Sequence, residues 1–132
     1  MPEFMLGTDT VSYALRGQRG VAERILAHRP SQLCISSITL AELRYGADLR
    51  NSKKLHRLID AFVESIEVLP FTTSAADKFP VVAFALTKRG EPIGTFDTLL
   101  AAHALSLGTT FVTNDLRHFS RVPELSSESW AG

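Results

Sequence analysis

The hydrophobic pattern of the chain alternates short continuous apolar runs with longer segments in which apolar residues recur at helical spacing. The short runs are FML (4–6), LCIS (33–36), EVLPF (67–71) and TTFVT (109–113). Runs of this length are too short for helices, and they are typical of strands that are buried on both faces of a sheet. The pattern therefore predicts four short apolar strands, of which 4–6 is expected to be buried.

The segments between and after the first strands predict helices at 11–20, 21–30, 38–50, 55–66, 74–89 and 95–108. The clearest is 55–66, whose apolar residues form one stripe. Pro80 lacks a backbone N–H, so we expect it to kink or interrupt the segment 74–89. Strands that alternate with helices predict an α/β fold, with a mostly parallel sheet and helices on both of its faces.

Composition narrows the class of protein. The length of 132 residues predicts one domain, and a hydrophobic content of 45% is typical of a globular protein. The formal net charge is zero, which argues against a nonspecific basic nucleic-acid binder but leaves a local basic surface open. Cys34 is the only cysteine, so a disulfide framework and a cysteine zinc site are excluded. No signal peptide or run of about 18 apolar residues is visible, so we expect a cytoplasmic protein without membrane contact.

Four acidic residues stand where a predicted strand ends or a helix begins: Asp9, Glu42, Asp97 and Asp115. In a parallel sheet these positions meet at one edge, where active sites of such folds form. Converging carboxylates repel one another unless a cation neutralises them, and Mg²⁺ or Mn²⁺ prefers oxygen ligands. The pattern therefore indicates metal-assisted phosphodiester hydrolysis.

Each of these carboxylates also has an ordinary structural interpretation. Asp9 and Asp97 are residues that can cap helices, and Asp115 is a common turn former. Glu42 is harder to explain in this way, because it lies in a mostly apolar segment where an unpaired glutamate is rarely buried. The residues alone leave both interpretations open.

Four blocks of the chain carry a resemblance to a known family: FML–TDT, CISSITLAELRYGA, RGEPIGTFDTLLAAHALSLG and FVTNDLRHFSRV. They cover essentially the whole length, and the second and third blocks are specific. On these blocks the chain resembles the PIN-domain ribonucleases, in particular the VapC toxins of bacterial VapBC toxin–antitoxin pairs. The resemblance implies a single PIN domain over residues 1–132, with an α/β/α sandwich and a mostly parallel central sheet.

The resemblance also implies an activity and a set of partners. It points to an endoribonuclease that depends on Mg²⁺ or Mn²⁺ and cleaves structured RNA, with tRNA as the first expectation. Members form homodimers, are held inactive by a small VapB-type antitoxin, and reach operator DNA only through that antitoxin. Two other functions are compatible with the sequence. One is a PIN protein that binds antitoxin or RNA without cleaving RNA, and the other is a DNA-directed nuclease built on the same carboxylates.

Carried over residue by residue, the resemblance implies catalytic and metal-binding roles for three of the carboxylates. Glu42 matches the glutamate of S-x-x-T-x-x-E-L, Asp97 the aspartate of F-D-x-x-x-A, and Asp115 the acidic position of T-N-D. Three neighbours are expected to support these ligands or a water molecule: Thr8, Thr113 and Asn114.

The first block departs from the family pattern, which reads leucine-aspartate-threonine-asparagine. Here Gly7 stands at the aspartate position, and Asp9 stands at the asparagine position. In one interpretation Asp9 takes over as a catalytic metal ligand, because residues two apart in an extended chain share a face. In another the site is impaired and the protein binds without cutting. A third is an engineered or accidental substitution at position 7.

Basic residues are expected to hold RNA by its phosphates. Arg44 and Arg89 are the preferred contacts, from a wider set that includes Arg16, Arg19, Lys88, Arg117 and His118. His103 lies six residues beyond Asp97 and does not share its helical face, so we expect it to be packed. The apolar segment FPVVAFAL predicts an interface with a second copy or with the antitoxin. The resemblance places antitoxin binding near the early helices and residues 43–62.

Overall fold

A computed structural model describes all 132 residues and contains seven α-helices, one 3₁₀ turn and five strands. In chain order they are β1 (Phe4–Leu6), α1 (Thr8–Leu15), α2 (Val21–Leu26), the 3₁₀ turn η1 (Pro30–Gln32), β2 (Leu33–Ser36), α3 (Ser37–Leu49), α4 (Lys53–Ser65), β3 (Glu67–Leu69), α5 (Thr73–Lys88), α6 (Thr95–Leu107), β4 (Thr110–Val112), α7 (Leu116–Phe119) and β5 (Ser127–Glu128). None of the helices combines the length and the apolar character that crossing a bilayer requires.

The five strands form one parallel sheet in the order β3-β2-β1-β4-β5. The chain builds outward from β1 through β2 to β3, then returns to the other side of β1 for β4 and β5. The strand order therefore reverses beside β1. In open parallel sheets, the carboxyl ends of the strands at such a reversal leave a crevice for ligands.

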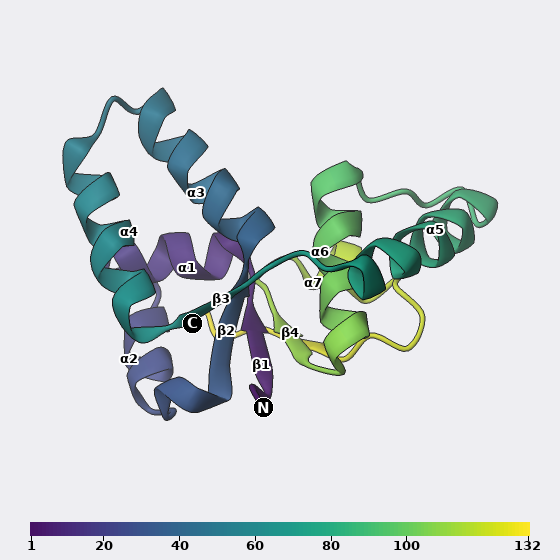
Figure 1. Ribbon diagram of the computed structural model, residues 1–132, viewed down its shortest axis with the longest axis horizontal. Helices are drawn as coiled ribbons and strands as arrows, with labels where there is room; N and C mark the ends of the chain where they lie inside the picture. The colour runs from purple at the N-terminus through teal and green to yellow at the C-terminus, as the bar shows by residue number, and fades with distance from the viewer.

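Two apolar cores cover the two faces of the sheet, which confirms the predicted α/β/α sandwich. Side chains alternate along the strands, so Leu6 and Val112 face one core while Met5 and Phe111 face the other. Helices α1 to α4 cover the first face, and α5, α6 and α7 cover the second (Figure 1). The two groups of helices rise on either side of the carboxyl end of β1 (Figure 1).

The four predicted strands are present, but some helix bounds differ from the prediction. Helix α1 begins at Thr8 rather than at residue 11, directly after Gly7 as its N-cap. Helix α5 continues through Pro80, so the predicted interruption is wrong. Its buried residues Val82 and Leu86 pack in the second core, and this tertiary packing offsets the hydrogen bond that proline removes.

Strand β5 was not predicted, because a strand of two residues has no measurable periodicity. The tail that follows it is nevertheless packed. Trp130 is 2% exposed, its indole N–H donates to Glu128 at 2.7 Å, and its ring stacks on His28 at 4.4 Å. This tryptophan belongs to the core on the side of helices α1 to α4.

Cys34 is expected to be inert to thiol reagents in the native protein. Burial raises the pKa of its thiol to about 12, and the Glu67 carboxylate adds to that rise. A shift of this size leaves roughly a thousandfold less thiolate than a free cysteine has. Labelling with a chromogenic disulfide at mildly alkaline pH should be slow in buffer and fast in concentrated urea. Rapid labelling in buffer would contradict the packing of β2 described here.

Candidate active site

A hollow of about 340 Å³ opens at the carboxyl ends of β1 and β4, where the strand order reverses. All four acidic residues that the sequence singled out line it. The complete lining is Thr8, Asp9, Ser12, Glu42, Asp97, Leu100, Phe111, Thr113, Asp115 and Phe119. The structure therefore brings together side chains from α1, α3, α6 and the loop after β4, as the parallel arrangement of strands predicted.

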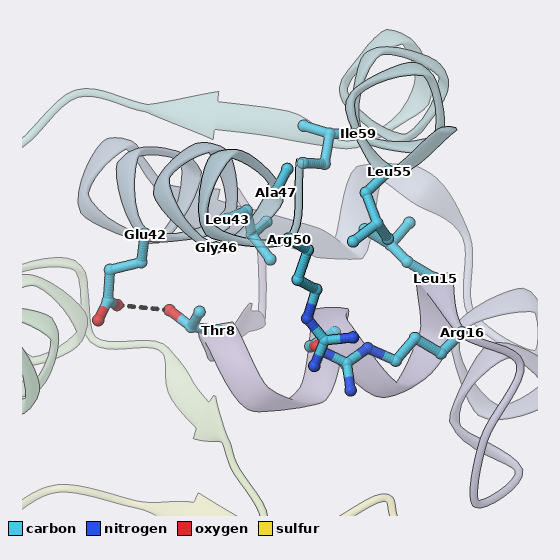
Figure 2. Close-up of a pocket in the computed structure, with 11 residues that line it drawn as sticks. Thr8, Leu15, Arg16, Glu42, Leu43, Gly46, Ala47, Arg50, Leu55 and Ile59 are labelled. Carbon is cyan, nitrogen blue, oxygen red and sulfur yellow. Dashed lines mark hydrogen bonds between the residues drawn. The ribbon is translucent and has the colours of Figure 1, made fainter. Parts of the chain in front are cut away.

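Glu42 is held by the first residue of α1. The Thr8 hydroxyl donates to Glu42 Oε1 at 2.6 Å and lies 3.2 Å from the Thr39 hydroxyl. Helix α3 presents both Thr39 and Glu42 to this side because residues three apart share a helical face. This contact explains how a glutamate is accommodated in an apolar segment, and it holds one of the two carboxylate oxygens (Figure 2).

Asp9 holds the loop that follows β4. Its Oδ2 accepts the backbone N–H of Asn114 at 2.8 Å, and its Oδ1 accepts the N–H of Thr10 at the same distance. The Thr113 hydroxyl lies 3.3 Å from Oδ2. Asp9 therefore connects the start of α1 to a segment more than a hundred residues away, in addition to lining the hollow.

Two substitutions of Asp9 distinguish the contribution of its hydrogen bonds to stability from the contribution of its charge. Asp9→Ala leaves two backbone N–H groups without their acceptors, and we expect the free energy of unfolding to fall by about 1–3 kcal/mol. Asp9→Asn keeps one of the two acceptor oxygens, so its loss should be about half as large. Urea unfolding of both variants measures the difference. Equal losses would mean that charge, and not hydrogen bonding, holds this loop.

Asp97, Asp115 and His118 form the tightest group in the hollow. One oxygen of each aspartate and one ring nitrogen of His118 lie within 4.8 Å of one another. His118 Nδ1 is 2.9 Å from Asp115 Oδ2 and 3.8 Å from Asp97 Oδ2. Asp115 also caps α7, accepting the backbone N–H of His118 at 3.2 Å, while its own N–H donates to the Thr113 hydroxyl. Both sequence interpretations of Asp115, as a turn former and as a member of the site, therefore fit its position.

Electrostatic repulsion inside the hollow is visible at Asp97. Burial raises the pKa of its carboxyl first, and the charges of Glu42 and Asp115 raise it further. Asp9 adds to the rise, and His118 acts in the opposite direction. Oxygen ligands that repel one another in this way are the donor set that a hard divalent cation neutralises. The residues present therefore fit Mg²⁺ or Mn²⁺.

The two arginines preferred as RNA contacts lie elsewhere. Arg44 donates to Asp60 at 2.6 Å and to the His56 carbonyl at 3.2 Å, so it joins α3 to α4. Arg89 donates to the Arg121 carbonyl at 2.8 Å and pairs with Glu91 at 3.1 Å. Neither lines the hollow. Their guanidinium groups already have partners, and a role in RNA binding stays a prediction.

Sequence reasoning missed two features of the hollow. It counted His118 only as a phosphate contact, although its position three residues after Asp115 at the start of a short helix was a signal for a pair. It gave no role to Phe111, whose ring packs on Phe119 with centroids 4.5 Å apart and reaches Gly7. His103, by contrast, is fully buried and hydrogen-bonded to Ser36 at 2.8 Å, as expected for a packed residue.

The fold and the hollow together define a class of protein. It is an α/β protein with a parallel sheet whose carboxyl edge gathers four acidic side chains in one site.

Comparisons with known proteins identify the family. The PIN domain family matches residues 5–125. The chain is 36% identical to the tRNA(fMet)-specific endonuclease VapC of Salmonella typhimurium, over 98% of this chain and 99% of the relative. The crystal structure of DNA-bound VapBC from Salmonella typhimurium matches with a TM-score of 0.89 and 37% identity, covering 99% of this chain and 100% of that chain. VapBC2 of Rickettsia felis, bound to a DNA fragment from its promoter, matches with a TM-score of 0.87 and 31% identity, over 96% and 98% of the two chains. The protein belongs to the PIN domain family, and its full-length relatives are VapC ribonucleases.

Proposed function

We propose that this protein is the toxin of a type II toxin–antitoxin pair and acts as a metal-dependent endoribonuclease on tRNA. The observation that carries the proposal is the convergence of Asp9, Glu42, Asp97 and Asp115 on one hollow. The full-length similarity to a tRNA(fMet)-specific endonuclease supports the choice of substrate. Because tRNA is a cytoplasmic molecule, we place the protein in the cytoplasm.

The residues of the hollow would have two kinds of role, metal binding and the positioning of neighbouring groups. Glu42, Asp97 and Asp115 would hold Mg²⁺ or Mn²⁺, which supplies a water molecule of lowered pKa and neutralises the phosphate. Thr8 orients Glu42, and Asp9 positions Thr113 and Asn114 beside that centre. His118 lies beside both aspartates, with Nδ1 2.9 Å from Asp115 and 3.8 Å from Asp97. The activity of Gly7→Asp variants tests whether Asp9 replaces, as a metal ligand, the carboxylate that the family pattern has at position 7.

An apolar hollow of about 390 Å³ supports antitoxin binding at the early helices. It lies between α1, α2 and α4 and is lined by apolar residues that include Ala14, Ile25, Leu26 and Phe62. Leu26 is 83% exposed and belongs to this lining, so it extends a contiguous apolar surface of the kind that marks protein–protein contacts. We propose that a VapB-type antitoxin covers this surface and that operator DNA is reached only through the antitoxin. The VapBC complexes with DNA support this arrangement.

A second exposed apolar surface supports a homodimer. Val81 and Phe84 of α5 are 63% and 68% exposed, within the segment FPVVAFAL. We propose that a second copy of the chain covers this face of α5.

The experiment that tests the proposed activity is cleavage of total tRNA by the purified protein in Mg²⁺ or Mn²⁺ and in EDTA. Glu42→Gln and Asp97→Asn should abolish cleavage. Glu64→Gln and Asp77→Asn are matched controls, because they remove the same charges at exposed positions of α4 and α5. Cleavage that survives Glu42→Gln and Asp97→Asn, or that persists in EDTA, would exclude the carboxylate–metal mechanism. Cleavage of single-stranded DNA in preference to tRNA would replace the proposed substrate.

A further inference from the structure

A groove runs from the carboxylate hollow along α1 and α3 toward α4. The carboxylate hollow and the next depression share Thr8, Ser12 and Glu42 as lining residues. That depression and a third one, of about 420 Å³, share Leu15, Arg16, Arg50 and Leu55. The three depressions are therefore continuous, with four carboxylates at one end and two arginines at the other.

The two arginines at the far end reach into the groove from different helices. Arg16 is the C-cap of α1 and Arg50 is the C-cap of α3. Figure 2 shows their guanidinium groups extended toward the same part of the groove. Neither forms an ion pair, whereas Arg44, Arg89 and Arg121 all pair with acidic side chains. Two like charges at one place, neither of them in an ion pair, favour an anionic ligand.

Between its two ends the groove is lined by apolar side chains and, at one position, by helix backbone without a side chain. Gly46 lies inside α3 and lines the groove, and a Cβ at this position would meet no atom within 4 Å. Glycine in a helix interior destabilises the helix relative to alanine, and it is used where another molecule approaches the backbone closely. Gly46 is therefore a second observation, independent of the arginine charges, that favours a ligand in the groove.

We propose that Arg16 and Arg50 bind a backbone phosphate of the RNA substrate while the phosphodiester that is cut lies at the carboxylates. The proposal rests on the proposed nuclease function. From Glu42 to Arg50 the helix rises about 12 Å, at roughly 1.5 Å per residue. One strand of a helical nucleic acid advances about 3.4 Å per phosphate, so the two ends are a few nucleotides apart.

RNA fits both ends of the groove better than an acidic protein segment does. The phosphate oxygens of RNA would bind a metal at the carboxylates. RNA also carries a negative charge at every nucleotide, so a second phosphate can bind the arginines. An acidic peptide could pair with the arginines but has no phosphate for the other end. The C-cap positions alone account for a favourable contact of each arginine with its own helix. They do not account for two unpaired arginines in one groove.

The test measures binding of a tRNA(fMet) transcript in an Asp97→Asn background, which removes cleavage at the carboxylate end and leaves the arginine end of the groove unchanged. Arg16→Gln combined with Arg50→Gln should weaken binding at least about tenfold and reduce the slope of log K against log salt by about 1.4 to 1.8. Arg16→Lys with Arg50→Lys should keep most of the slope but lose affinity. Arg29→Gln is the matched control, because Arg29 is exposed and precedes β2 at the opposite end of the sheet.

A steric variant tests the same groove without changing charge. Gly46→Leu should weaken tRNA binding while leaving the salt slope unchanged, and Ala61→Leu on the exposed side of α4 should have no effect. Thermal unfolding of each variant checks that it is folded. Neutral methylphosphonate linkages, moved one nucleotide at a time along a short RNA, should weaken binding at one position in the parent and not in the double glutamine variant.

Three results would overturn the proposal. Unchanged tRNA affinity and slope in the double glutamine variant, with cleavage by the parent intact, would exclude the arginine subsite and leave the nuclease function standing. Displacement of tRNA by polyglutamate from the parent, but not from that variant, would assign the groove to an acidic protein. Absence of both tRNA binding and tRNA cleavage by the parent would remove the proposed function as well as the subsite.

Discussion

Gly7→Asp alone is expected to destabilise the protein by about 1–3 kcal/mol instead of creating a stronger nuclease. A Cβ at position 7 would lie 2.9 Å from Cζ of Phe111 and 3.0 Å from the Val112 carbonyl oxygen. The Phe111 ring is 1% exposed and packs on Phe119, so it has little room to move. The backbone conformation of Gly7 is not an obstacle, since its φ of −74° is one that any residue adopts.

The contact with Phe111 can be relieved without emptying the core. Leucine at position 111 lacks the Cε and Cζ atoms that reach Gly7. The variant that carries both Gly7→Asp and Phe111→Leu should therefore be more stable than the sum of the two single changes predicts. Gly7→Ala is the control that adds the Cβ without the charge. Urea unfolding gives the coupling, and tRNA cleavage in Mn²⁺ gives the activity.

The outcome separates the interpretations of position 7. Higher activity in the double variant than in the parent would mean that Gly7 weakens the native site. Equal activity would mean that Asp9 already supplies the missing charge. A fully stable and more active Gly7→Asp protein would contradict the steric argument, because it would require Phe111 to move freely.

Asp97→Asn is expected to lower tRNA cleavage by at least about 100-fold and yet to stabilise the metal-free protein. The first effect follows from the loss of a carboxylate in the tightest part of the site. The second follows from the raised pKa of Asp97, since its charged form is disfavoured by burial and by Glu42 and Asp115. An asparagine removes that cost in the folded state.

The stability difference should depend on pH in a definite direction. The folded protein binds the Asp97 proton more tightly than the unfolded chain, whose aspartate has the ordinary pKa of 3.8. Stability of the parent therefore falls as pH rises from 3.8 through the folded pKa, and the advantage of Asp97→Asn appears over that range. Thermal unfolding in EDTA at several pH values measures it, with Asp77→Asn as the control.

Divalent cations should make the parent more stable than Asp97→Asn, which is the reverse of the order expected in EDTA. Mn²⁺ should bind the folded parent and stabilise it by mass action, and Asp97→Asn should gain less. A variant that is less stable than the parent in EDTA at neutral pH would contradict the repulsion described here.

Much of the frame could be predicted from the sequence because each element carries a local signal. The buried strands are short continuous apolar runs, and a parallel sheet brings the ends of those strands to one edge whatever the details of packing. The convergence of Glu42, Asp97 and Asp115 followed from that rule. Pro80 was misjudged because local propensity was outweighed by the packing of α5 on the second core.

The parts that could not be predicted depend on contacts between residues distant in sequence. Gly7 and Phe111 are 104 positions apart, and nothing in a single sequence says that one accommodates the other. The hydrogen bond from Asn114 to Asp9 spans a similar separation. Arg44 and Arg89 were attractive candidates as exposed cations, and only the structure reveals that Asp60 and Glu91 already pair with them.

The order of strands in the sheet has a consequence for the timing of synthesis. Residues 1–107 carry three of the four carboxylates, but β4, which pairs with the central strand β1, and Asp115 beyond it come later. A nascent chain emerges from the ribosome beginning at its N-terminus. Until β4 and the loop after it have emerged, the hollow lacks the lining residues Phe111, Thr113 and Asp115, and Asp9 lacks its hydrogen bond from Asn114. A ribosome that makes this protein is therefore not exposed to an assembled site until almost the whole chain has been translated.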